Sequence, residues 1–166
     1  MGIKKLKSLE LFAGAGGLSL GLHQAGFQHI ALVEWNARAV KTLKINCEQL
    51  LNLNPELVFE EDVREFPLSS LEQNIDLIAG GPPCQPFSTS GKSLAHLDQR
   101  DMFPSFLNAI RVLRPKSILI ENVKGLLRDR FKEYFEYIIL RIQYPFAVNG
   151  ENNFSDELRK LRRLKA

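Results

Sequence analysis

Residues 8–22 read Ser-Leu-Glu-Leu-Phe-Ala-Gly-Ala-Gly-Gly-Leu-Ser-Leu-Gly-Leu, a strand pattern that runs through a glycine-rich turn into a helix pattern. Glycines in such a turn let the backbone approach a ligand closely. The dinucleotide fingerprint Gly-x-Gly-x-x-Gly is not met, because its third glycine, counted from Gly14, would stand at Ser19. The stretch therefore predicts the first strand–turn–helix unit of an α/β protein and disfavours a nicotinamide cofactor.

On either side of this turn, apolar β-branched stretches alternate with helix patterns, which is typical of a mostly parallel sheet with helices on both faces. We expect strands at residues 8–12, 30–34, 57–60, 75–79 and 117–121. Helices are expected from Pro104 to Leu113, from Phe131 to Ile142, and after Asn36, which is a good N-cap. The helix after Asn36 is expected to bury one face, formed by Ala37, Val40, Leu43, Cys47 and Leu50.

The 166 residues include 45% hydrophobic and 25% charged residues, which predicts one globular domain. No apolar run reaches the roughly 18–20 residues of a membrane span and no signal-peptide core is present, so we expect an intracellular protein. The two cysteines lack the spacing of a metal site, and no metal is expected. Residues 1–127 hold 13 Lys/Arg and 13 Asp/Glu, whereas residues 128–166 hold 9 and 6, so the basic surplus lies at the C-terminal end, where a solvated helix face is the preferred interpretation.

Polar and aromatic residues follow the second and third expected strands. Glu34 lies 20 residues after Gly14, the spacing at which a carboxylate can accept hydrogen bonds from both hydroxyls of an adenosine ribose. Trp35 offers a flat face for adenine, and Asp62 offers an acceptor for its amino group. Because parallel strands end at one edge of a sheet, these residues and the glycine turn predict a nucleoside-type cofactor without a pyrophosphate.

The fourth expected strand runs into Gly-Gly-Pro-Pro-Cys-Gln-Pro-Phe-Ser, residues 80–88. Prolines on either side of Cys84 fix φ and exclude helix, so we expect its thiol on a stiff, extended loop, as a nucleophile requires. A free cysteine is usually an inert core residue, but a proline-rich loop at the ligand edge is not a core position. The fifth expected strand ends at Glu121, where apolar surroundings would favour the protonated carboxyl and therefore a proton donor.

Six motifs, in chain order, resemble the signature motifs of the cytosine-C5 DNA methyltransferases over about residues 7–146. They are Phe-Ala-Gly-Ala-Gly-Gly from residue 12, Glu-Trp-Asn from 34, Glu-Asp-Val-Arg from 61, the nine-residue stretch from 80, Asp-Gln-Arg-Asp-Met-Phe from 98 and Glu-Asn-Val from 121. The resemblance implies a Rossmann-like S-adenosylmethionine-dependent methyltransferase fold, incomplete at its C-terminal side. It also implies methyl transfer to carbon 5 of a flipped cytosine in duplex DNA, in a bacterial restriction-modification context and therefore in the cytoplasm.

The same resemblance implies roles for individual residues. Cys84 is the nucleophile that adds to carbon 6 of cytosine, Glu121 stabilises the charge that then develops on the base, and Asn122 supports the loop. The residues expected to bind S-adenosylmethionine are Phe12, Ala13, Gly14, Ala15, Gly16, Gly17 and Leu18 around its amino-acid part, Glu34 at its ribose, Trp35, Asp62 and Val63 at its adenine, and Pro82. The residues expected to contact DNA phosphates are Ser88 and Arg100.

After Glu-Asn-Val, members of this family continue to a Gln-x-Arg-x-Arg motif and a target-recognition region, neither of which occurs in this sequence. We therefore expect residues 1–146 to form the cofactor-binding and catalytic core and residues 147–166 a truncated basic connecting segment. Little activity is expected without a second chain that supplies the missing part. An RNA cytosine-C5 methyltransferase and a non-catalytic S-adenosylmethionine-binding subunit remain alternatives.

Overall fold

The computed structural model describes residues 5–71, 74–83, 101–150 and 153–165. The chain forms two compact units, Met1–Gly81 with Leu113–Glu121, and Pro82–Val112 with Asn122–Ala166. Cys84, Ser88 and Arg100 lie outside the described residues, so their expected roles stay predictions.

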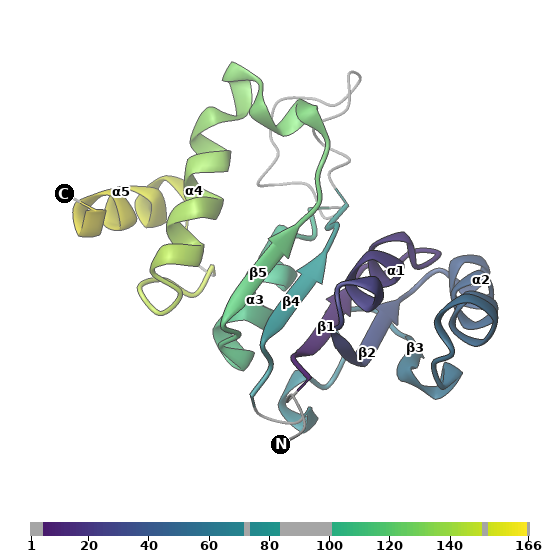
Figure 1. The fold of residues 1–166 in the computed structure, drawn as a ribbon. Coiled ribbons are helices and arrows are strands. Elements are labelled where there is room, and N and C mark those ends of the chain that lie inside the picture. Colours follow the sequence, from purple (N-terminus) through teal and green to yellow (C-terminus); the bar gives the residue numbers. More distant parts are fainter. Residues whose placement is uncertain (1–4, 72–73, 84–100, 151–152, 166) are drawn as a thin grey trace. The chain divides into compact units, whose positions relative to one another are not determined.

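The first unit is built on a parallel sheet whose described strands follow the order β3-β2-β1-β4-β5 (Figure 1). The strands are β1 (Lys7–Leu11), β2 (Gln28–Glu34), β3 (Val58–Glu60), β4 (Leu77–Gly80) and β5 (Ser117–Ile120). Each begins and ends within two residues of its predicted bounds. The predicted mostly parallel sheet is therefore confirmed.

Helix α2 (Ala37–Asn46) follows β2 and continues as a π-helix, η1 (Cys47–Leu51). As predicted, Asn36 caps it: the Asn36 side chain accepts hydrogen bonds from the backbone amides of Arg38 and Ala39. Helix α1 (Gly17–Gln24) lies between β1 and β2. Two short 3-10 helices, η2 (Pro55–Leu57) and η3 (Leu68–Ser70), lie before and after β3.

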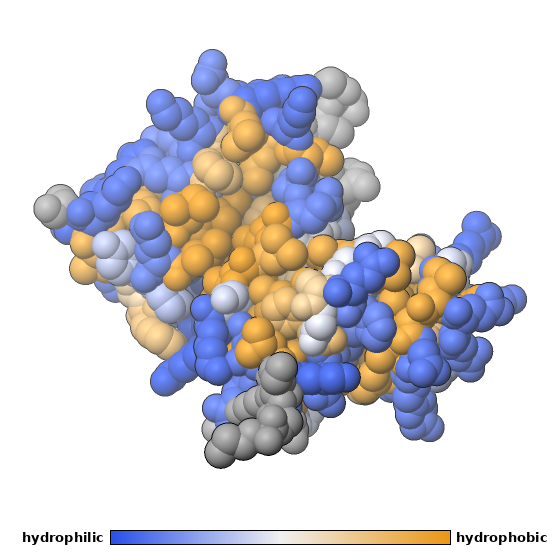
Figure 2. Space-filling model, in the orientation of Figure 1, coloured by the Kyte–Doolittle hydropathy of each residue, from blue (hydrophilic) through white to orange (hydrophobic). Residues whose placement is uncertain are grey.

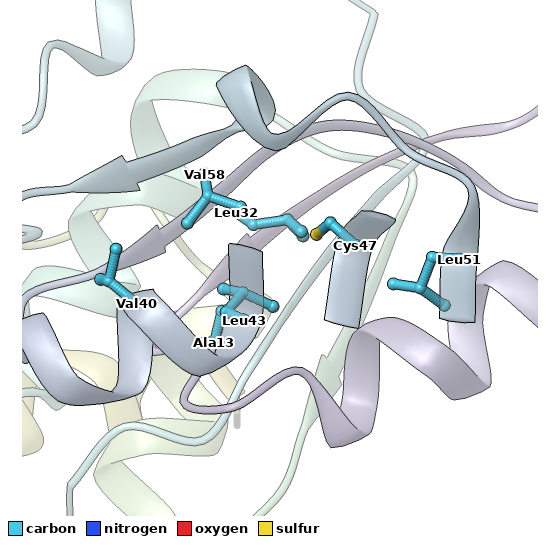
Figure 3. Packing of buried hydrophobic residues seen from close by; sticks show 7 residues of the cluster. All are labelled: Ala13, Leu32, Val40, Leu43, Cys47, Leu51 and Val58. Atoms are coloured by element: carbon cyan, nitrogen blue, oxygen red, sulfur yellow. The ribbon is translucent and has the colours of Figure 1, made fainter. Parts of the chain in front are cut away.

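Apolar side chains of α2 and η1 pack against β2, β3 and the turn after β1. The cluster consists of Ala13, Leu32, Val40, Leu43, Cys47, Leu51 and Val58 (Figure 3). Cys47 is fully buried there, which confirms its predicted place in the core. The prediction was wrong for Ala37 and Leu50, which are exposed. The π-helix widens the turn at Cys47, changes the phase of the side chains and buries Leu51 in place of Leu50.

β5 is the edge strand of this sheet. Among the described residues it pairs with β4 on one side and with no strand on the other. Its side chains alternate between exposed and half-buried, and Figure 2 shows hydrophobic surface over this strand. A nearly continuous apolar strand of this kind is usually covered on both faces in a parallel sheet.

The described residues of the second unit form the α-helices α3 (Phe103–Leu113), α4 (Lys132–Gln143) and α5 (Phe154–Lys165). Two short 3-10 helices, η6 (Lys124–Leu127) and η7 (Asp129–Phe131), precede α4. Asp101 connects α3 with α4, because its carboxylate accepts hydrogen bonds from the amide of Phe103 and from the hydroxyl of Tyr134. The first two helices predicted for this region are thus confirmed to within two residues.

A buried ion pair joins α4 to α5. The Arg141 Nη1 atom lies 3.6 Å from the Glu157 carboxylate, and the Tyr137 hydroxyl donates to the same carboxylate at 2.6 Å. Burial raises the pKa of Tyr137 to about 12. On the surface, Arg162 pairs with Glu133 and Glu136, so the basic C-terminal helix is partly neutralised within its own unit. No helix in the described part of the chain has the length and apolar character needed to cross a membrane.

Candidate functional site

The carboxyl ends of the parallel strands carry most of the residues that the sequence singled out. The glycine turn follows β1, Glu34 ends β2, Gly81 follows β4 and Glu121 follows β5. In open α/β sheets ligands bind at this edge, where the strand order changes direction. Here β1 lies between β2 and β4, which places the glycine turn at that point.

The glycine turn uses backbone conformations that L-residues rarely adopt. Its φ angles are positive at Phe12 (60°), Gly14 (56°) and Gly16 (94°). A left-handed phenylalanine stores strain, and such strain gathers at functional sites. The Ala13 amide donates to the carbonyl of Val33, which fixes the turn on β2. Among the described residues beyond its two chain neighbours, none has a heavy atom within 4 Å of where a Cβ on Gly14 would stand, so a ligand can approach the backbone there.

Gly16 is required for both its conformation and its space. A Cβ at this position would lie 2.6 Å from Cδ1 of Leu43 in the core, and its φ of 94° penalises any side chain. We expect Gly16→Ala to lower the free energy of unfolding by about 2–3 kcal/mol, measured by urea denaturation. The matched control is Gly17→Ala, whose Cβ would have no neighbouring atom within 4 Å in the described part of the chain. Equal losses in the two variants would contradict this assignment.

Glu34 joins the glycine turn to the start of α2. Its Oε2 accepts a hydrogen bond from the amide of Gly14 at 2.9 Å, and its Oε1 accepts one from the amide of Asn36 at 2.8 Å. The side chain is only 7% exposed. A carboxylate has about four acceptor positions, so two remain for the hydroxyls of a ribose. The hydrogen bond between Glu34 and Gly14 was not predicted from the sequence, although their separation of 20 residues was one reason to assign Glu34 to the ribose.

The residues predicted to hold adenine differ in their surroundings. Trp35 directly follows β2 and is 68% exposed, whereas Val63 is buried. Asp62 accepts hydrogen bonds from the side chain of Arg64, with an Nη2–Oδ2 distance of 2.5 Å. These bonds from Arg64 lower the pKa of Asp62 below its ordinary value. The sequence had not indicated this pairing, and an adenine amino group would have to share the carboxylate with Arg64.

Glu121 lies directly beside the glycine that precedes Pro82. Its amide donates to the carbonyl of Gly80 at 3.0 Å, which continues the register of β5. A Cβ built on Gly81 would lie 2.8 Å from Oε2 of Glu121, so the carboxylate occupies the space that this glycine leaves. The predicted apolar surroundings are not found among the described residues, where Glu121 is exposed.

Asn122, which is expected to support the loop, contacts its first proline. Its Nδ2 donates to the carbonyl of Pro82 at 3.3 Å, and its Oδ1 accepts from the amide of Val123. Pro82 itself is buried. The amide side chain therefore holds the first residue of the proline-rich segment. The described residues contain no cluster of side chains that could hold a metal ion.

Comparison with known proteins adds to this geometry. A family model described as "C-5 cytosine-specific DNA methylase" matches residues 6–143. The chain is 46% identical over 132 residues to the Type II methyltransferase M.NgoMIV of Neisseria gonorrhoeae, covering 79% of this chain and 40% of that protein. It is 44% identical over 141 residues to M.Eco47II of Escherichia coli, covering 82% of this chain and 32% of that protein.

Among solved structures, a prophage-encoded E. coli protein assigned as a DNA modification methyltransferase superposes with a TM-score of 0.64 at 29% identity. The alignment covers 84% of this chain and 38% of that one. The chain therefore spans less than half of the length of these relatives.

Proposed function

We propose, because the chain belongs to the C-5 cytosine-specific DNA methylase family, that it supplies the cofactor-binding and nucleophilic part of a cytosine-C5 DNA methyltransferase. One contact carries the proposal furthest. The Glu121 carboxylate lies against Gly81, immediately before Pro82-Pro83-Cys84, so the two residues with proposed chemical roles follow neighbouring strands. The named Type II relatives favour a restriction-modification context.

S-adenosylmethionine fits the residues at the edge of the sheet. The open backbone at Gly14 admits the amino-acid part, and Glu34 retains acceptor positions for the ribose. Trp35 presents an exposed ring on which adenine can stack, and Val63, which is buried, is assigned to the same adenine site. The remaining residues assigned to this site are Phe12, Ala13, Ala15, Gly16, Gly17, Leu18, Asp62 and Pro82. When bound, the cofactor supplies an electrophilic methyl group.

The chain's own residues then activate the base. Carbon 5 of cytosine is too electron-poor to attack the methyl group unaided, so the Cys84 thiolate adds to carbon 6 and makes carbon 5 nucleophilic. Glu121, hydrogen-bonded to ring nitrogen 3 and the exocyclic amine, stabilises the charge that develops. After methyl transfer a base removes the proton from carbon 5, and Cys84 leaves from carbon 6. The target cytosine has to be flipped out of the duplex to meet these groups.

The proposed partner is duplex DNA, with Ser88 and Arg100 as phosphate contacts. The proposed location is the cytoplasm, in keeping with the bacterial restriction-modification context. Residues 1–146 form the proposed core and residues 147–166 a basic connecting segment. Because the relatives are more than twice as long as the region matched, we propose that recognition of the target needs further polypeptide. That polypeptide is a continuation of this chain or a second chain.

The test is transfer of labelled methyl from S-adenosylmethionine to duplex DNA and to transfer RNA. The chain is assayed alone and together with the remaining part of M.NgoMIV as a separate polypeptide. We expect transfer to DNA only in the mixture. Methyl transfer to RNA and not to DNA would favour the RNA methyltransferase. Cofactor binding without transfer to either nucleic acid would favour a non-catalytic subunit. Full activity of the chain alone would refute the need for further polypeptide.

Gly81 gives this function a geometric test. Its φ is not in the left-handed region, so Gly81→Ala leaves the backbone unstrained but forces Oε2 of Glu121 to move. The complemented enzyme is the mixture of this chain with the remaining part of M.NgoMIV. We expect its rate of methyl transfer to fall about 10- to 100-fold, because a catalytic group misplaced by about 1 Å costs that much. The free energy of unfolding should change by less than about 0.5 kcal/mol. A normal rate would show that the position of Glu121 is not critical.

A further inference from the structure

Four polar side chains are buried together beneath the start of α1. Ser8 and Glu10 come from β1, Ser19 from α1 and His29 from β2, and each is at most 3% exposed. Their neighbours on this side of the sheet are apolar, including Leu32, which is the register partner of Glu10. Buried polar groups are costly unless they are hydrogen-bonded, so a connected set needs a reason.

A β-bulge brings His29 into this set. The register between β1 and β2 shifts after Ser8, which pairs with His29, whereas Leu9 pairs with Ala31. A bulge re-aims a side chain, and here the imidazole lies on the same side as Ser8. Its Nδ1 is 3.1 Å from the Ser8 hydroxyl and its Nε2 is 3.1 Å from the carbonyl of Ser19. Because a carbonyl only accepts, Nε2 carries the proton, and Nδ1 of the neutral ring accepts from Ser8.

Glu10 takes the place of a missing helix cap. The N-cap of α1 is Gly16, which has no side chain to satisfy the first amides of the helix. Ser19, the third residue of α1, donates its hydroxyl to Oε2 of Glu10 at 2.7 Å, and its backbone also hydrogen-bonds to this carboxylate. Ser19 is thus held by Glu10 on one side and by His29 on the other, directly after the glycine turn.

We propose that Glu10, with Ser19 and His29, is a positioning network that holds the glycine turn in its binding conformation, so that cofactor affinity depends on the ionisation state of Glu10. The proposal rests on the proposed function, in which this turn binds S-adenosylmethionine. Glu10 is buried, so it acts through Ser19 and the start of α1 rather than by touching the ligand.

The environment of Glu10 makes its ionisation relevant near neutral pH. Burial raises the pKa of Glu10 to about 7, and the hydrogen bonds from Ser19 oppose that rise. The titratable group that faces Glu10 from η1 is the Cys47 thiol. His29 is linked to Glu10 through Ser19, and the ring of His23 stacks on the ring of His29. Burial lowers the pKa of His29 and raises the pKa of Cys47, which favours the neutral form of both groups.

The direction of the effect follows from the charge of the cap. An ionised carboxylate forms stronger hydrogen bonds with Ser19 and is favoured by the positive end of the helix dipole. A firmly held turn binds the cofactor better, so binding and ionisation of Glu10 support each other, and binding releases a proton below about pH 7. If cofactor binding lowers the pKa of Glu10 by about one unit, the cofactor binds about fivefold more tightly at pH 8 than at pH 6.

The experiment measures the dissociation constant of S-adenosylhomocysteine by calorimetry from about pH 6 to about pH 8. The 166-residue chain is compared with Glu10→Gln, Ser19→Ala and, as a control, Glu48→Gln, which alters an exposed carboxylate on η1. We expect the wild type and Glu48→Gln to show the same pH dependence and Glu10→Gln to lose it. Ser19→Ala should bind several-fold more weakly at every pH, and its melting temperature should fall because the buried Glu10 carboxylate loses the hydrogen bond from the Ser19 hydroxyl.

Each outcome decides between the possibilities. A purely structural role for Glu10 would lower the melting temperature of Glu10→Gln but leave the slope of affinity against pH unchanged, and this result would overturn the proposal. If Glu10→Gln does not fold, unaltered binding by Ser19→Ala or a pH-independent wild type would overturn it. Failure of the wild type to bind at any pH would refute the proposed cofactor site as well, so the two failures are distinguishable.

Discussion

Cys84→Ala is expected to reduce methyl transfer by the complemented enzyme by about 10⁴-fold or more, because it removes the proposed nucleophile that adds to carbon 6 of cytosine. The same variant should form no covalent adduct with duplex DNA that contains 5-fluorocytosine. Fluorine at carbon 5 cannot leave as a proton does, so wild-type enzyme remains attached to such DNA after methyl transfer. The adduct is measured as a band of reduced mobility in a denaturing gel.

The second cysteine supplies the matched control. Cys47 is fully buried in the cluster between α2 and the sheet, and Figure 3 shows its sulfur directed toward Leu32. We expect Cys47→Ala to lower the free energy of unfolding by about 1 kcal/mol while adduct formation and methyl transfer continue. Cofactor binding by Cys84→Ala should be unchanged. An adduct in Cys84→Ala, or its loss in Cys47→Ala, would reject the assignment of the nucleophile.

The strands were predictable because a parallel sheet buries both faces of its strands. Such strands read as short apolar runs bounded by polar or turn residues, as Leu9, Ala31 and Ile78 illustrate with no exposed surface. Which side chains face the core beyond Cys47 was not predictable, because a π-helix replaces the regular α-helical turn there. Side-chain periodicity assumes about 3.6 residues per turn and has no means of anticipating that change.

The positions of the candidate site residues at the strand ends were predictable, and their hydrogen-bond partners were not. Glu34 and Asp62 were identified from their places at strand ends, but the partners they bind, Gly14 and Arg64, depend on how the turns fold back. His29 gave no signal at all, since regular alternation from Ala31 would have placed it on the opposite side of β2 from Leu32 and Glu10. The β-bulge that reverses this is a property of strand pairing.

Glu121→Gln is expected to lower the rate of methyl transfer about 100-fold while the KM for DNA changes little. Glutamine keeps the shape of the side chain and can still hydrogen-bond to the base, but it cannot provide the charge or the proton of a carboxyl group. The control is Glu60→Gln, which alters another exposed carboxylate at the end of a strand of the same sheet. A normal rate for Glu121→Gln, or an equal loss for Glu60→Gln, would remove Glu121 from the mechanism.

Combining this substitution with Gly81→Ala separates position from chemistry. If the alanine methyl group acts only by displacing the Glu121 carboxylate, the double variant should be no slower than Glu121→Gln alone, because the group that is displaced has already lost its function. If the methyl group instead disturbs the Pro82-Pro83-Cys84 segment, the two losses should multiply to about 10³-fold or more. Non-additive losses would therefore tie the space beside Gly81 to the carboxylate that fills it.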